Sequence, residues 1–194
     1  RIKLIRGATL IHGLTRALSG IPSYPRQFTP ASGGDPAVLT LNGVTITNSH
    51  ADLGIAWKNN VGIYYSSTDN LTVALTGENT ITTSTIPEVN AYGYPDTEAF
   101  YSNNTAAITF SGTGSLTATA GETTANSYGS NTGIYATGSV MIAEGTTVTA
   151  IASAASRESY GFRCNSNLIV NGILTGTGGT STYKSSYGIA AINI

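Results

Sequence analysis

The stretch GIYYSSTDNLTVALTGENTITT, residues 62–83, decides the fold. It contains three short segments in which apolar residues alternate with hydroxyl-bearing ones, separated by residues that favour turns. The same alternation occurs in Leu39-Thr40-Leu41 and in Ile108-Thr109-Phe110. A period of two predicts β-strands, because successive side chains of a strand point to opposite faces. We therefore expect three short strands in this stretch, with the apolar residues of each strand on one side.

Equivalents of this stretch recur along the chain. The first segment of each unit carries an apolar residue after Gly or Ala, and these residues are spaced 37, 34, 28 and 27 positions apart: Ile63, Phe100, Ile134, Phe162 and Ile189. The second segment of each unit ends at a glycine, in the series Gly43, Gly77, Gly112, Gly145 and Gly172. Such a repeat is typical of stacked architectures in which each unit contacts its neighbours. We predict an all-β fold, a right-handed parallel β-helix of about five to six three-stranded coils over residues 35–194.

In this arrangement, equivalent residues form columns along the stack. The apolar column just named faces inward. A second inward column consists mostly of small residues: Tyr65, Ser102, Ala136, Cys164 and Ala191. The glycines occupy a corner of each coil, where a positive φ or close packing excludes a Cβ. Cys164, the only cysteine, is expected to be a small packed residue, which excludes a disulfide framework.

Residues 1–34 do not join the repeat and form a predicted N-terminal arm, cap or donor segment. The early part has apolar residues at helical spacing, and the prolines of SGIPSYPRQFTP then break the pattern. The open strand edges at the end of a β-helix must be covered or they pair with another chain. We expect the apolar residues of the arm to make such a contact, namely Ile2, Leu4, Leu10, Ile11 and Leu14.

Charge is sparse and unevenly distributed. Only 10% of the 194 residues are charged, and the net charge is −1. Residues 1–34 carry five basic residues and no acidic one, giving +5, whereas residues 35–194 carry four basic and ten acidic ones, giving −6. The body therefore lacks the basic face that a nucleic-acid-binding protein needs. No apolar stretch reaches the roughly 18–20 residues of a membrane span, so no span is expected.

At this point the repeats resemble a known family. The stretches AVLTLNGVTITNS, GIYYSSTDNLTVALTGENTITT and SYGSNTGIYATGSVMIAEGTTVTA are similar to carbohydrate-binding β-helix repeats of bacterial cell-surface proteins, one clostridial member of which binds polygalacturonate. The resemblance covers roughly residues 37–194. It implies a right-handed parallel β-helix at the cell surface or outside the cell, and a polysaccharide ligand.

Tyrosines dominate the outward positions of the first segments. Tyr64, Tyr101 and Tyr135 precede Arg163 and Ala190 in one outward series, while Tyr160 and Tyr187 stand just before their glycines. In the predicted register these rings form ladders along the stack. Three roles remain open for them: stabilisation of neighbouring coils, an assembly interface, or stacking on sugar rings.

The sequence offers no assembled catalytic site. His12 and His50 do not form a zinc motif, and the carboxylates are dispersed over loops. Asp96 and Glu98 are the only close acidic pair, which makes them weak candidates for calcium. We therefore expect a protein that is not an enzyme and has no cofactor other than this calcium.

The last unit, SYGIAAINI at residues 186–194, contains only its first segment. We expect a structural subunit that stacks head to tail into a fibre or adhesive appendage, in which the next subunit completes the last coil. One alternative is a cell-surface module that binds a pectin-like polysaccharide. Another is that the sequence is part of a longer surface protein. In each case the expected location is extracellular or at the cell surface.

Overall fold

The computed structural model describes residues 26–28, 37–48, 60–85, 96–123 and 128–194. These residues form strands and turns, and none of them is helical, so this part of the chain has no helix that could cross a membrane. The strands are β1 (Arg26–Phe28), β2 (Ala37–Asn42), β3 (Thr45–Asn48), β4 (Asn60–Tyr65), β5 (Leu71–Thr76), β6 (Glu78–Thr83), β7 (Thr97–Ser102), β8 (Ile108–Gly112), β9 (Ser115–Ala120), β10 (Ser130–Ala136), β11 (Val140–Ile142), β12 (Thr147–Ala152), β13 (Glu158–Val170), β14 (Ile173–Thr177) and β15 (Ser186–Asn193).

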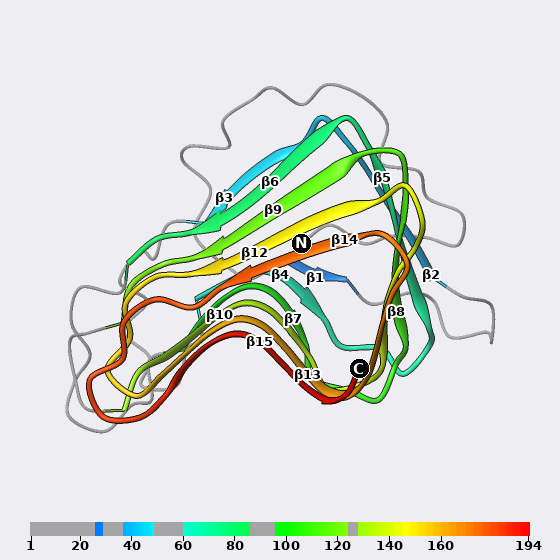
Figure 1. Ribbon diagram of the computed structural model, residues 1–194. Coiled ribbons are helices and arrows are strands. Elements are labelled where there is room, and N and C mark those ends of the chain that lie inside the picture. The colour runs from blue at the N-terminus through cyan, green and yellow to red at the C-terminus, as the bar shows by residue number, and fades with distance from the viewer. Residues whose placement is uncertain (1–25, 29–36, 49–59, 86–95, 124–127) are drawn as a thin grey trace.

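Every strand pairing is parallel and joins strands that are not consecutive in the chain. Strands β1, β4, β7, β10, β13 and β15 form sheet A, and strands β3, β6, β9, β12 and β14 form sheet C. Strands β2, β5, β8 and β11 form sheet B together with the end of β13, which therefore belongs to both sheets A and B. The three sheets curl around a shared interior, with sheet C on one side and strands β4, β7, β10, β13 and β15 of sheet A on the other (Figure 1). The all-β, parallel part of the prediction is confirmed.

The register places equivalent residues side by side, as the spacing predicted. Ile63 pairs with Phe100, Phe100 with Ile134, Ile134 with Phe162, and Phe162 with Ile189. The second predicted inward column is also in register, and its first four members are no more than 2% exposed: Tyr65, Ser102, Ala136 and Cys164. The free thiol of Cys164 is buried, in agreement with its predicted packing role.

The core is built from the inward half of each strand. In β5 the burial alternates, with Leu71, Val73 and Leu75 buried and Thr72 and Ala74 between them more exposed. Sheet B contributes Leu39, Val73, Phe110 and Ile142 as one continuous buried column. Stacking of like residues gives the strands between the two ends apolar neighbours above, below and across the interior, which is the main favourable contribution to folding.

The glycine corners follow the prediction in conformation but not fully in register. Gly43, Gly77, Gly112 and Gly145 all have a positive φ, which a residue with a Cβ adopts only with strain. The register is wrong at one step, because Gly112 pairs with Leu75 rather than with Gly77. The shift arises because the chain turns from β8 into β9 two residues later, so that the amide of Ser115 donates to the carbonyl of Gly77 at 2.8 Å.

A second series of glycines, which the sequence did not single out, allows sheet A to approach sheet C. A Cβ at Gly133 would lie 2.6 Å from the backbone nitrogen of Ile151 and 2.7 Å from the carbonyl oxygen of Gly161. Both distances are shorter than a Cβ contact allows, and the obstructing atoms are backbone. Gly133 is therefore required by packing between sheets rather than by φ.

We expect Gly133→Ala to lower the free energy of unfolding by about 3 kcal/mol, because the added methyl group forces strands of two sheets apart. Urea denaturation followed by circular dichroism measures the loss. Gly145→Ala is the comparison, since a Cβ there meets only Gly112 at 3.8 Å and the cost comes from its φ of 78°. We expect about 1–2 kcal/mol for this second variant. Equal losses would contradict the packing argument.

The predicted N-terminal arm is only partly within the described residues. Ile2, Leu4, Leu10, Ile11 and Leu14 lie outside them. Within the arm, β1 pairs in parallel with β4, with Phe28 opposite Tyr65. This short strand therefore continues sheet A into the segment that the sequence assigned to the arm, and the 37 residues from Arg26 to its partner Ile63 equal the spacing from Ile63 to Phe100.

Candidate functional site

An aromatic strip runs along the outer face of sheet A, and we use this name for Tyr64, Tyr101, Tyr135, Arg163, Tyr160 and Tyr187. Tyr64 and Tyr101 stack with ring centroids 5.3 Å apart, and Tyr101 and Tyr135 do the same. The guanidinium of Arg163 lies 5.2 Å from the ring of Tyr135 and 4.7 Å from that of Tyr160. Tyr160 in turn stacks on Tyr187 at 5.2 Å. All five predicted tyrosines therefore join one continuous strip, in which Arg163 connects the two ladders.

The geometry of the strip limits what its rings can bind. Interplanar angles between stacked rings are 16°, 15° and 9°, so that the rings lie nearly parallel. Tyr101 has a neighbouring ring on each face, and Tyr135 has a ring on one face and a guanidinium on the other. A sugar ring stacks on the face of an aromatic ring, and these two faces are occupied by the protein itself. The middle of the strip therefore favours stabilisation of adjacent strands.

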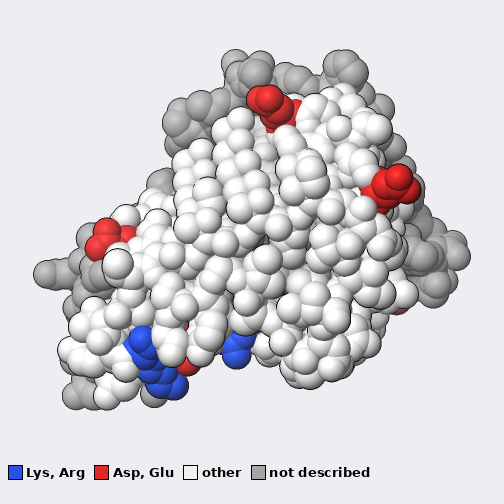
Figure 2. Space-filling view, in the orientation of Figure 1, with Lys and Arg blue, Asp and Glu red and all other residues white. Residues whose placement is uncertain are grey.

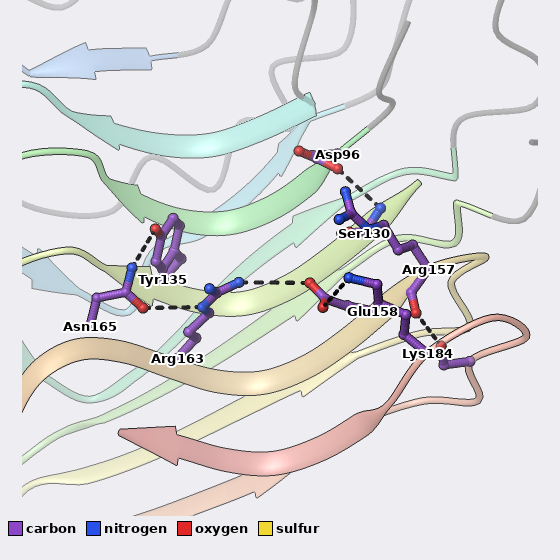
Figure 3. Close-up of polar contacts among 9 residues, drawn as sticks. Asp96, Ser130, Tyr135, Arg157, Glu158, Arg163, Asn165 and Lys184 are labelled. Carbon is purple, nitrogen blue, oxygen red and sulfur yellow. Dashed lines mark hydrogen bonds and ion pairs between the residues drawn. The ribbon is translucent and has the colours of Figure 1, made fainter. Parts of the chain in front are cut away.

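Polar side chains fix the position of Arg163 between the ladders (Figure 3). Its Nε donates to Oδ1 of Asn165 at 3.2 Å, and the Asn165 amide donates to the hydroxyl of Tyr135 at 2.8 Å. On the other side, Glu158 lies 4.0 Å from the guanidinium of Arg163 and 3.4 Å from Nζ of Lys184. These groups are partly exposed, so the ion pairs contribute little to stability, but they orient the guanidinium plane.

An acidic pair lies at the start of β7 beside the strip, with Asp96 directly before the strand and Glu98 within it. Oδ1 of Asp96 accepts a hydrogen bond of 3.0 Å from the amide of Ser130, at the start of β10. Burial raises the pKa of Asp96 to about 6, although this hydrogen bond and the charge of Arg157 oppose the shift. Glu98 is 6% exposed, and burial together with the charge of Asp96 raises its pKa well above the usual range. Of the two carboxyl groups that the sequence identified as a close pair, Glu98 is thus buried and Asp96 is partly buried.

We expect Tyr101→Leu to lower the free energy of unfolding by about 2 kcal/mol, because each stacked aromatic pair is worth about 0.5–1.5 kcal/mol beyond its buried area. Tyr187→Leu is the comparison, since Tyr187 is 44% exposed and stacks on Tyr160 alone among the described rings. About half the loss is expected there. Urea denaturation of both variants measures the difference, and a larger loss for Tyr187→Leu would contradict the ladder as a stabilising element.

The last repeat exposes side chains that are buried in every earlier described repeat. Ile189 is 38% exposed, whereas the residues before it in the same column, such as Phe162 at 0%, are inaccessible. Val170 is 39% exposed, and its predecessor in register, Ile142, is 0% exposed. Leu174 and Ala191 are also only partly buried. We call the surface formed by Val170, Leu174, Ile189 and Ala191 the open end.

Some of these features could be predicted from the sequence and others could not. The five tyrosines and the outward place of Arg163 follow from the repeat spacing. The insertion of Arg163 between Tyr135 and Tyr160 and its support by Asn165 were missed, because they depend on side-chain geometry at a bend of sheet A. The burial of Glu98 was missed because an acidic residue next to a loop is normally solvated.

No His, Cys, Asp and Glu residues within the described ranges form a group of three or more that could hold a metal ion. Comparisons with protein-family models, with curated proteins and with solved structures find no match to this chain. The functional argument therefore depends on the geometry of the open end, the aromatic strip and the acidic pair.

Proposed function

We propose that the chain forms a right-handed parallel β-helix whose role is structural. In this reading each set of three strands, one from each sheet, is one coil. The parallel pairing of β1 with β4, β2 with β5 and β3 with β6, continued strand by strand along each sheet, supports it. The hand follows from the general preference of connections between parallel strands for right-handed crossovers.

The proposed function is that of a non-enzymatic extracellular subunit that stacks head to tail into a fibre or adhesive appendage. The observation that carries it is the open end, because the inward columns of the last coil remain accessible. An apolar surface beside unpaired strand edges pairs readily with another chain. A contact between two different surfaces of identical subunits that does not close generates a fibre.

A second copy of the chain is the occupant that the described residues favour. One outward column of sheet B runs through Val38, Thr72, Thr109, Met141 and Ile169. Its two end members are apolar and exposed, Val38 at 50% and Ile169 at 52%, while Thr72, Thr109 and the partly buried Met141 lie between them. Placing the open end of one copy on the first coil of another in register brings these two apolar residues together.

Charge supports the same orientation. Residues 1–34 carry +5, and residues 35–194 carry −6, so that the N-terminal part of one subunit attracts the body of another. Charged side chains are few on the face drawn in Figure 2, so that ionic repulsion opposes the stacking weakly. The two ends differ in one respect, because Leu39 and Leu41 in the first described coil are only 1% exposed.

The test is sedimentation velocity over a range of protein concentrations, followed by negative-stain electron microscopy. We expect the average mass to rise with concentration and the microscope to show rods one subunit wide. A protein that remains monomeric at the highest concentration, with its β-rich spectrum intact, would contradict the proposal.

A second candidate function is binding of an anionic, pectin-like polysaccharide. Two exposed tyrosines favour it: Tyr128, which is 55% exposed, and Tyr183, which is 65% exposed. Backbone hydrogen bonds from Arg157 to Gly129 and from Tyr183 to Ser156 place both at one corner of successive repeats. Lys184 adds a positive charge there. Affinity electrophoresis in polygalacturonate gels tests this candidate, and retardation that survives Tyr183→Ala with Lys184→Ala would exclude this corner.

A further inference from the structure

Glu98 is a buried carboxyl group that lacks a partner on one oxygen. Its Oε2 atom has no hydrogen-bond partner in the structure. It is in register with Thr132 on β10 and, one strand further, with Tyr160 of the aromatic strip. Glu98 therefore lies on the outer side of sheet A, where its side chain is nevertheless 94% inaccessible (6% exposed).

Both protonation states of this carboxyl group require something that the described chain does not supply. An ionised Glu98 needs donors or a cation on Oε2, because an uncompensated buried charge is very costly. A protonated Glu98 needs an acceptor for its hydroxyl hydrogen, and a buried donor without an acceptor costs about 1–3 kcal/mol. A cation bound at Oε2 removes this cost for the ionised group. A water molecule that accepts the hydrogen bond removes it for the protonated group.

The neighbouring charges favour the cation. Asp96 lies two residues before Glu98, directly ahead of β7, and it is the charged group whose field acts on Glu98. The positive charges of Arg157 and Arg163 lower the pKa of Asp96, and so compensate the charge of Asp96 and not that of Glu98. The Asp96 side chain is already held in place by the amide of Ser130, which pre-orders one carboxylate and leaves its second oxygen for another contact.

We propose that Asp96 and Glu98 form a binding site for a hard divalent cation, coordinated by carboxylate oxygens on the outer face of β7. Hard cations such as Ca²⁺ take oxygen ligands and tolerate irregular geometry with water in the remaining positions. The bound ion connects β7 to β10 through the Asp96–Ser130 hydrogen bond, next to the ring of Tyr101. This proposal does not depend on the fibre.

The experiment uses the full chain freed of metal with a chelator, and the probes are CaCl₂, MgCl₂ and TbCl₃ added separately. Tb³⁺ replaces Ca²⁺ at oxygen sites and emits when a nearby tyrosine is excited. We expect tyrosine-sensitised emission from the wild-type protein, strong reduction in Tyr101→Phe, and competition by CaCl₂. The melting temperature is expected to rise by about 5–10 °C at a hundredfold excess of Ca²⁺ over its Kd.

Glu98→Gln is the decisive variant because it keeps the shape of the side chain and removes its charge. It is expected to fold, to lose the Tb³⁺ emission and to lose the thermal shift. Glu158→Gln is the matched control, since Glu158 is an acidic residue of the same sheet face that already pairs with Arg163 and Lys184. It is expected to keep both signals. Equal responses of wild type and Glu98→Gln to every ion, including no response, would overturn the proposal and leave water as the partner of Oε2.

Discussion

Phe100→Ala is expected to lower the free energy of unfolding by about 4 kcal/mol, a large share of the stability of a domain of this size. The side chain of Phe100 is 1% exposed and lies in the middle of the inward column of sheet A. Its ring meets that of Phe110 from sheet B edge to face, with centroids 5.6 Å apart. The variant removes this contact and leaves a cavity between two sheets.

Urea denaturation followed by circular dichroism measures the loss. Phe100→Leu is the control, because it keeps most of the volume, and we expect it to cost less than about 2 kcal/mol. Thr109→Ala, on the outer side of sheet B, is expected to fall within about 0.5 kcal/mol of wild type. If Phe100→Ala cost no more than Thr109→Ala, the inward column would not be the core of this protein.

The strong predictability of this core has a physical origin. In a stack of parallel strands, one register error moves a whole column out of contact, so the sequence repeats the same residue type at each level. The repeat spacing alone predicts that Ile63, Phe100, Ile134 and Phe162 form a column. The same redundancy made the outward tyrosines visible, since they occupy one position in consecutive units.

Features that depend on the local structure of one repeat could not be predicted in this way. The register shift at Gly112 is a local property of the turn from β8 into β9. Gly133 is required because strands of another sheet approach it, and the sequence gives no sign of that distance. The burial of Glu98 likewise depends on how its neighbours cover it, whereas composition alone makes a charged residue beside a loop an exposed one.

The open end leads to the prediction with the largest effect on assembly. Ile189→Lys is expected to abolish the growth of average mass with protein concentration. In a stacked arrangement the charge would lie between two coils, where an unpaired ammonium group is strongly unfavourable. In the single subunit the same lysine can reach solvent, because the position is already 38% exposed. The effect on folding is therefore expected to be small compared with the effect on association.

Ile173→Lys distinguishes a specific contact at the open end from association through general surface hydrophobicity. Ile173 belongs to the same last repeat and is more exposed, at 60%, but it is in register with Thr147 and so lies on the outer side of sheet C. A charge there does not enter the proposed contact, and assembly is expected to persist. If both variants lost assembly equally, general surface hydrophobicity would explain the association. If Ile189→Lys assembled like wild type, the open end would not be the contact surface, because a buried lysine cannot be tolerated between stacked coils.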